Sequence, residues 1–193
     1  MKKNTSSFFG LLVSIVFSLF FYSCGENATS NSSINKTQSD KVSPPKTTAA
    51  KLIFSDEFDV EGAVDSSKWL FETVPPNNGG WWNNEKQHYT DRLDNAYVSE
   101  GTLKIVAKKE EYTFAGSTKN YTSARLNSKF NFTYGRIDVK AKLPEGAGTW
   151  PAIWTLGANL GTAGWPVCGE IDIMEHWGNN QNYVQSAMHT PSS

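Results

Sequence analysis

The sequence predicts an all-β domain, a sandwich or jelly roll of two antiparallel sheets. Three observations lead to this class. After residue 51 apolar and polar residues alternate with period two, clusters of Asn, Gly and Pro separate the alternating stretches, and no segment shows a convincing helical repeat. Aromatic residues make up 13% of the chain, which suits a large β core or a surface that stacks on ring-shaped ligands.

The first 24 residues have the pattern of an export signal. Lys2 and Lys3 form a charged start, and residues 8–22 are a nearly unbroken apolar run. A run of about 15 apolar residues is short for a membrane span and typical of a signal sequence. Ser23 before Cys24 resembles the lipobox of bacterial lipoproteins, whose cysteine is acylated. We therefore expect an exported lipoprotein anchored to a bacterial membrane, in the periplasm, outer membrane or cell surface; an ordinary cleaved signal peptide is the alternative.

Residues 25–50 contain Ser, Thr, Asn, Lys and Pro with scarcely an apolar side chain, and they predict a disordered tether. The folded domain is expected over 51–193. The chain has 18 Lys+Arg against 19 Asp+Glu and a net charge of −1, which gives no reason to expect a nucleic-acid partner. We expect a monomer.

Within the domain, strands are expected over 101–108 and 134–143. In the second, Ile137 and Val139 alternate with Arg136 and Asp138, as in a half-buried antiparallel strand. Turns are expected at 77–80 (NNGG) and 144–148 (PEGAG). A further strand is expected over 183–190, after which the sequence stops without a closing element, so we expect the sandwich to be incomplete at its C-terminal side.

The segment 169–177 (GEIDIMEHW) places Glu170, Asp172 and Glu175 in a strand that is otherwise apolar. Glu170 and Asp172 share a face because side chains alternate along a strand. Glu175 lies an odd number of residues from Glu170, so it joins that face only if Met174 or a neighbour is the extra residue of a β-bulge.

Three carboxylates on one face repel one another, which raises at least one pKa and separates their roles. Retaining glycoside hydrolysis uses such a pair, one ionised and one protonated, with the carboxyl groups ~5–5.5 Å apart. Two other interpretations stay open at this point: calcium binding with help from carbonyl oxygens, and simple solvation.

Several motifs in one order resemble family 16 glycoside hydrolases, and within it the bacterial laminarinases, which are endo-β-1,3-glucanases with a concanavalin A-like jelly-roll fold. The motifs are WPVCGEIDIMEHWG at 165–178, FSDEFD at 54–59, NNEKQHYT at 83–90, YGRIDVKAKLP at 134–144 and WPAIWTLG at 150–157. The resemblance covers residues 52–193. The C-terminal strands of the family are absent from the sequence.

The resemblance implies retaining endo-hydrolysis of a laminarin-like β-1,3-glucan. Glu170 would be the nucleophile, Asp172 the assisting carboxylate and Glu175 the general acid/base. Mixed-linkage glucan, agar or carrageenan as substrate, and a non-catalytic carbohydrate-binding fragment, are the alternatives. The absence of Lys and Arg from 150–189 favours a neutral glucan over a sulfated galactan.

Candidate sugar-binding residues surround the acids. Trp150 and Trp154 share a face in an extended strand and either stack on pyranose rings or pack in the core. Asn84 and Arg125 match family positions that bind sugar hydroxyls on the non-reducing side, although Arg125 is equally a candidate for a structural ion pair. The family often has a histidine near the acid/base, and His189 is the candidate here.

No cofactor is expected for catalysis. The resemblance implies a structural Ca²⁺ on the convex face, with main-chain oxygens from Glu57 and Gly101. Cys168 has no partner if Cys24 is lipidated, and we expect a buried, inert thiol.

Overall fold

The computed structural model describes residues 9–12 and 51–192. The predicted lipidation site Cys24, the tether and most of the predicted signal segment lie outside these residues. Residues 51–55 belong to a separate unit, so the architecture below concerns the unit that contains Asp56 onward and the strand formed by Phe9–Leu12.

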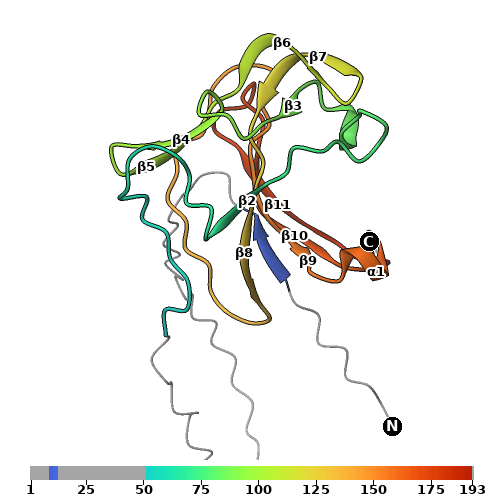
Figure 1. Cartoon of the computed structure of the whole chain (residues 1–193). Coiled ribbons are helices and arrows are strands. Elements are labelled where there is room, and N and C mark those ends of the chain that lie inside the picture. The colour runs from blue at the N-terminus through green and yellow to red at the C-terminus, as the bar shows by residue number, and fades with distance from the viewer. Residues whose placement is uncertain (1–8, 13–50, 193) are drawn as a thin grey trace, which may run out of the picture. The chain divides into compact units, whose positions relative to one another are not determined.

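The main sheet has six strands in the order β11-β10-β9-β1-β8-β2, and every pair in it is antiparallel. Figure 1 shows these strands crossing the centre of the molecule and running to its lower right. Their bounds are β1 Phe9–Leu12, β2 Trp69–Phe71, β8 Leu126–Phe132, β9 Ala152–Gly157, β10 Glu170–His176 and β11 Val184–His189.

Two smaller sheets lie above and beside the main sheet in the view of Figure 1. One has the order β3-β7-β6, and the other pairs β4 with β5. The all-β class is confirmed, although the described strands form three sheets rather than two, and β3 pairs parallel with β7. Their bounds are β3 His88–Tyr89, β4 Ala96–Ser99, β5 Thr102–Ile105, β6 Lys108–Phe114 and β7 Ser117–Ser123.

Strand β1 occupies the position between β8 and β9 and pairs with both. Its residues fall in the apolar run that the sequence assigns to the export signal. The structure thus places Phe9–Leu12 in the sheet, whereas the sequence pattern assigns the same residues to an export signal. Export stays a prediction.

The expected strand over 134–143 is wrong as a hydrogen-bonded element, because the structure assigns no strand there. The alternation itself is present: Ile137 and Val139 are half-buried, whereas Arg136 and Asp138 are exposed. Sequence period reports which side chains face the protein, whereas a strand also needs a neighbour for its backbone groups, and none of the described segments pairs with this one.

The predicted turn at 77–80 is confirmed by a bridge between Asn77 and Gly80. Asn78 and Gly79 have φ of 49° and 89°, and this left-handed backbone at both central positions is the reason for the Asn-Gly pair. Helix is confined, in the described ranges, to the single-turn elements η1 (Trp82–Asn84) and α1 (Leu160–Ala163). Neither has the length or hydrophobicity to cross a bilayer.

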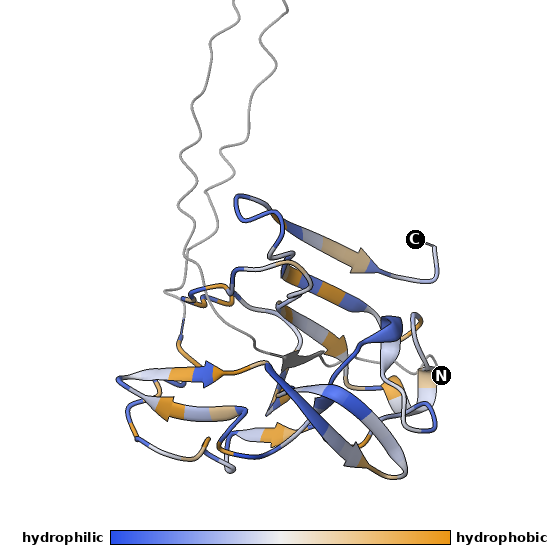
Figure 2. Cartoon of the chain, turned by 90° about the horizontal axis from the view of Figure 1, so that it is seen from above, coloured by the Kyte–Doolittle hydropathy of each residue, from blue (hydrophilic) through white to orange (hydrophobic). Residues whose placement is uncertain are grey.

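The two faces of the main sheet differ around β10. Asp172 and Glu175 are buried on one face, whereas Ile171 and Met188 on the opposite face are 39% and 64% exposed. Figure 2 shows β9, β10 and β11 side by side with apolar and polar residues alternating along them. The polar positions of this alternation carry the candidate site.

Candidate active site

The predicted bulge is present in β10. Against β9, Asp172 pairs with Trp154, but Met174 already pairs with Ile153, so one extra residue is inserted after Asp172. Against β11 the register shifts between Asp172 and Glu175. Glu175 consequently joins the face of Glu170 and Asp172, which the sequence allowed only with this irregularity.

Each acid lies at the centre of a row of three residues across β9, β10 and β11. Residues that pair across strands share a face, so all three rows lie on the same surface of the sheet. The rows are Leu156, Glu170 and His189; Trp154, Asp172 and Ala187; and Ala152, Glu175 and Gln185.

Glu170 is partly exposed, so its carboxylate remains open to a ligand. Its Oε2 accepts a hydrogen bond from Trp165 Nε1 at 2.7 Å. One oxygen of Glu170, one of Asp172 and a ring nitrogen of His189 lie within 4.8 Å of one another. Glu170 therefore has the exposure that a nucleophile requires and neighbours that fix its orientation.

Asp172 is only 4% exposed, and its Oδ2 lies 3.0 Å from Nε2 of His189. Burial and then the neighbouring charges of Glu170 and Glu175 raise the pKa of Asp172 to about 6, against the smaller opposing effect of His189. Asp172 thus resists ionisation, which lets it hold a proton beside its neighbours.

Glu175 is 8% exposed and has two hydrogen-bond donors. Trp150 Nε1 donates to Oε1 at 2.9 Å, and Gln185 Nε2 donates to Oε2 at 3.0 Å. Both donors come from neighbouring segments, one just before β9 and one on β11. The carboxyl group of Glu175 is therefore held in one orientation from two sides.

The predicted tryptophans both lie on the acid face. Trp150 is 43% exposed and stacks on Trp177 with ring centroids 6.0 Å apart. Trp154 faces the guanidinium of Arg125, whose Cζ is 4.7 Å from the ring centroid. Arg125 also forms an ion pair with Glu72, with 2.5 Å between Nε and Oε2. It is therefore both an ion-pair partner and a residue of the acid face.

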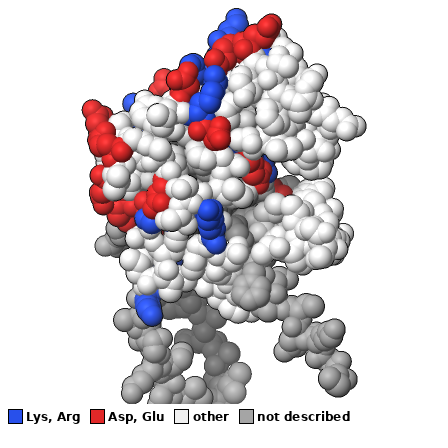
Figure 3. All heavy atoms as spheres, in the orientation of Figure 1, with Lys and Arg blue, Asp and Glu red and all other residues white. Residues whose placement is uncertain are grey.

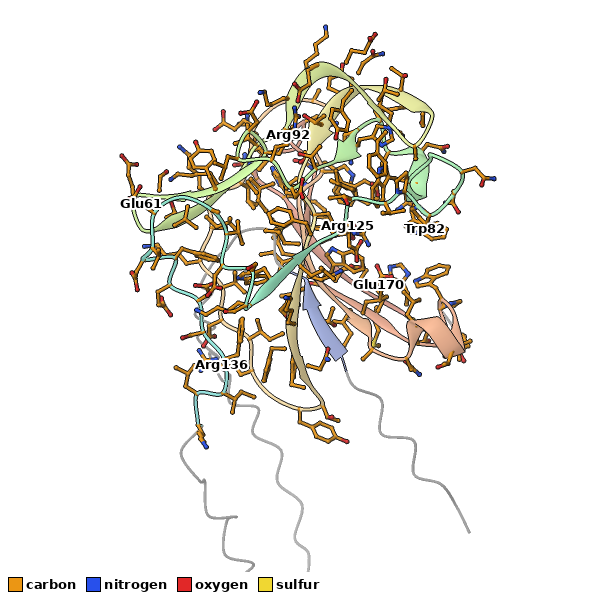
Figure 4. The ribbon with its side chains drawn as sticks, viewed as in Figure 1. Glu61, Trp82, Arg92, Arg125, Arg136 and Glu170 are labelled. Atoms are coloured by element: carbon orange, nitrogen blue, oxygen red, sulfur yellow. The ribbon has the colours of Figure 1, made fainter. Side chains whose placement is uncertain are left out.

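Asn84 is exposed at the end of η1 and has a left-handed backbone with φ of 57°. Figure 4 shows Trp82 of the same helix, Arg125 and Glu170 on one side of the molecule. In Figure 3, acidic and basic atoms reach the surface in a hollow between the lobe of η1 and that of β9–β11, and the surface over β9–β11 itself is almost free of charged groups.

His189 differs from its expected position. The resemblance implies a histidine near the acid/base, but the register places His189 opposite Glu170, and Gln185 is the residue opposite Glu175. His189 instead contacts Asp172. Cys168 agrees with expectation: it is 3% exposed with a free thiol, and burial raises its pKa.

The predicted calcium ligands are main-chain oxygens of Glu57 and Gly101, and the side-chain arrangement does not test them. In the described part of the chain, the His, Cys, Asp and Glu side chains close enough to share an ion are Glu170, Asp172 and His189. Glu57 is exposed, and the carboxylate that reaches the β4–β5 turn of Gly101 is Glu61, whose Oε1 accepts a hydrogen bond from Glu100 N at 2.9 Å. A calcium site built from main-chain oxygens stays a prediction.

Three residues of the site were not predicted from the sequence: Trp165, Gln185 and Glu72. Gln185 could have been found, because it shares strand parity with His189. Trp165 approaches Glu170 from the loop before β10, and Glu72 reaches Arg125 from beside β2. Neither position follows from a periodicity.

Comparison with known proteins gives a consistent result. Residues 69–193 match the family described as "XgeA-like, catalytic GH16 domain". A β-glucanase of Rhodothermus marinus is 46% identical over 145 residues, which cover 72% of this chain and 48% of that protein. A keratan-sulfate endo-1,4-β-galactosidase of Sphingobacterium multivorum is 34% identical over an alignment that covers 100% of this chain and 46% of the relative.

Among solved structures, LamA of Zobellia galactanivorans in complex with laminaritriose and laminaritetraose has 53% sequence identity and a TM-score of 0.64. The alignment covers 70% of this chain and 65% of that one. The chain thus spans about half the length of the curated relatives it matches.

Proposed function

The chain belongs to glycoside hydrolase family 16, and we propose that it hydrolyses internal bonds of a laminarin-like β-1,3-glucan with retention of configuration, Glu170 acting as nucleophile and Glu175 as general acid/base. The observation that carries this proposal is the bulge in β10, which brings three carboxylates to one face of a sheet. A purely structural strand has no need of this irregularity.

In the first step, an oxygen of Glu170 attacks the anomeric carbon while the bond to the leaving sugar breaks. The leaving oxygen takes the electron pair and receives the proton of Glu175. In the second step, Glu175 removes a proton from water, the water oxygen attacks the same carbon, and Glu170 leaves as a carboxylate. Asp172, with its pKa raised to about 6, holds a proton or a hydrogen bond beside Glu170.

The aromatic residues supply the sugar-binding surface. Trp150 contacts Glu175 directly, and Trp154 lies opposite Asp172, so a pyranose stacked on either ring would lie over the acids. Arg125 adds hydrogen-bond donors, and Glu72 balances its charge. This lining favours a neutral glucan.

A second candidate is hydrolysis of another polysaccharide by the same machinery. The observation that favours it is the relative named as a keratan-sulfate endo-1,4-β-galactosidase, with which the whole chain aligns. The shortage of basic residues in 150–189 argues against a sulfated substrate. Parallel assays on laminarin, lichenan, agarose, carrageenan and keratan sulfate separate these candidates, and we expect the highest rate on laminarin.

The test of the catalytic assignment compares the parent chain with Glu170→Gln and Glu175→Gln by reducing-sugar release from laminarin. Each substitution should lower the rate roughly 10³-fold or more, because either step needs both groups. Glu111→Gln, the same change on the exposed face of β6, is the matched control and should keep the parent rate. Near-normal activity of either active-site variant would contradict the assignment.

A second readout separates the two glutamates. Azide needs no general base, so in a Glu175→Ala variant it should restore turnover of an activated aryl glycoside and give a glycosyl azide of retained configuration; in Glu170→Ala it can only displace the leaving group directly, which gives the inverted azide. An inverted azide from the Glu175 variant together with a retained one from the Glu170 variant would reverse the two roles.

We also propose that the protein is exported and anchored to a membrane through Cys24. The support for this is the charged start, the apolar run and the Ser23-Cys24 pair.

A further inference from the structure

Trp165 makes the hydrogen bond that fixes the proposed nucleophile. Its indole Nε1 donates to Glu170 Oε2 at 2.7 Å, and its ring centroid is 5.7 Å from that of His189. The side chain nevertheless remains 58% exposed. Hydrogen bonds to an ionised acceptor are stronger than neutral ones, so this contact is well suited to fix the orientation of the Glu170 carboxylate.

The loop that carries Trp165 is tied down at several points. Cys168 N donates to Gly164 O at 2.8 Å, and Gly169 N donates to Pro166 O at 3.0 Å. Gly157, the last residue of β9, donates its N–H to Gly169 O at 2.9 Å. A Cβ at Gly157 would lie 2.0 Å from Cys168 O, so the loop packs directly on the end of β9.

We propose that Trp165 is a positioning residue for the nucleophile: it holds Oε2 of Glu170 and leaves Oε1 as the oxygen that attacks the anomeric carbon. This inference rests on the proposed function. The anchored loop fixes the donor, and the donor fixes the carboxylate, so the orientation of Glu170 is set before substrate binds.

The same hydrogen bond should act differently on the two chemical steps. When Oε1 attacks, the bond to the leaving oxygen breaks, the leaving oxygen takes the electron pair and a proton from Glu175, and Oε2 becomes the carbonyl oxygen of a glycosyl ester. When water attacks in the second step, Glu175 takes its proton and the electron pair of the ester bond returns to Glu170. Negative charge then develops on Oε2, where the indole N–H stabilises it.

Removal of the N–H should therefore slow the second step more than the first. We expect Trp165→Phe to lower the rate of deglycosylation about 10-fold, which corresponds to about 1.4 kcal/mol. The rate of glycosylation should change less, because two effects oppose each other. Without the indole N–H the Glu170 carboxylate is less well oriented, but it is also a stronger nucleophile.

The experiment uses the full chain and a 2,4-dinitrophenyl laminaribioside in stopped flow. This leaving group makes the first step fast, so dinitrophenol released in a burst reports glycosylation and the steady state reports deglycosylation. Trp165→Phe should give a burst near one equivalent of enzyme with a rate within about 3-fold of the parent, followed by a steady-state rate about 10-fold lower. Trp165→His, which retains a ring N–H, should recover part of the steady-state rate.

Val167→Ala is the matched control, since Val167 is an exposed residue of the same loop, and it should show parent kinetics. Thermal melts of every variant verify folding. An unchanged steady state in Trp165→Phe, or equal losses in burst and steady state, would overturn the inference while leaving the proposed function intact. A parent chain that hydrolyses neither laminarin nor the aryl glycoside would overturn the proposed function itself.

Discussion

Each of the two glutamates accepts a hydrogen bond from a tryptophan, Glu170 from Trp165 and Glu175 from Trp150, whereas Asp172 between them contacts a histidine. The surroundings of the three acids thus differ although their chemistry is the same. The indole donors orient the carboxyl groups of the outer acids, and burial beside two other acids raises the pKa of the middle one.

The raised pKa of Asp172 predicts an effect on stability. The unfolded carboxyl has a pKa near 3.8 and the folded one about 6, so the folded state binds the proton more tightly. Stability from this group is therefore present at low pH and is lost as the pH rises through about 6.

Asp172→Asn removes that loss, because the amide does not ionise. We expect the variant to melt about 2–4 °C above the parent at pH 8, as for roughly 1 kcal/mol in a domain of this size, with the difference shrinking as the pH falls toward 4. Thermal melts from pH 4 to 8 measure it. A difference that does not vary with pH would contradict the account, and the variant should also lose hydrolytic activity.

At this scale the sequence was a good guide to the acids and a partial guide to their partners. Strand parity and the need for a bulge placed the acids on one face with Trp154. The hydrogen bonds of Trp165 and the register of His189 depend on a loop conformation and a strand pairing, and parity alone determines neither.

At the scale of the element, the bulge in β10 decides which face Glu175 occupies. Deletion of Ile173 would remove the extra residue and leave Glu170, Asp172 and Glu175 at every second position, so a regular strand without the bulge would still hold all three on one face. We expect the deletion variant to retain measurable laminarin hydrolysis and a β-rich circular dichroism spectrum.

Ile173→Ala is the matched control for that deletion. It shortens the same half-buried side chain but keeps the extra residue, so it should lower the melting temperature and leave turnover largely intact. A loss of roughly 10³-fold or more in a folded deletion variant would contradict this account, because it would show that the extra residue does more than set the face of Glu175.

The segment 134–143 shows what periodicity can and cannot predict. Its alternating exposure was correct, since packing of every second side chain depends on local sequence. Its lack of a strand partner was not predictable, because pairing depends on another segment that the pattern does not identify.

At the scale of the whole molecule, Phe9–Leu12 raises a question about processing. In the structure these residues form β1 and pair with both β8 and β9. Proposed export would remove them at Cys24, and the mature chain would then lack the strand between β8 and β9.

Expression in a bacterial host that processes lipoproteins tests this directly. We expect the protein to partition into the membrane fraction, with an intact mass that fits cleavage before Cys24 plus acylation. Cys24→Ser is the control and should leave the protein unacylated and outside the membrane fraction. An unprocessed chain that retains residues 1–23 would contradict the anchor and favour the use of Phe9–Leu12 as a sheet strand.

The central claim is that Glu170 forms a covalent bond to the sugar, and trapping that bond tests it most directly. In a 2-deoxy-2-fluoro laminaribioside the fluorine slows both chemical steps, and a good leaving group restores the rate of the first step only. The glycosyl ester should therefore accumulate. Peptide mass spectrometry of the inactivated protein should find one added 2-deoxy-2-fluoro-laminaribiosyl group on Glu170. A label on Glu175, or continued turnover of laminarin by fully treated protein with no label on any carboxylate, would contradict the account.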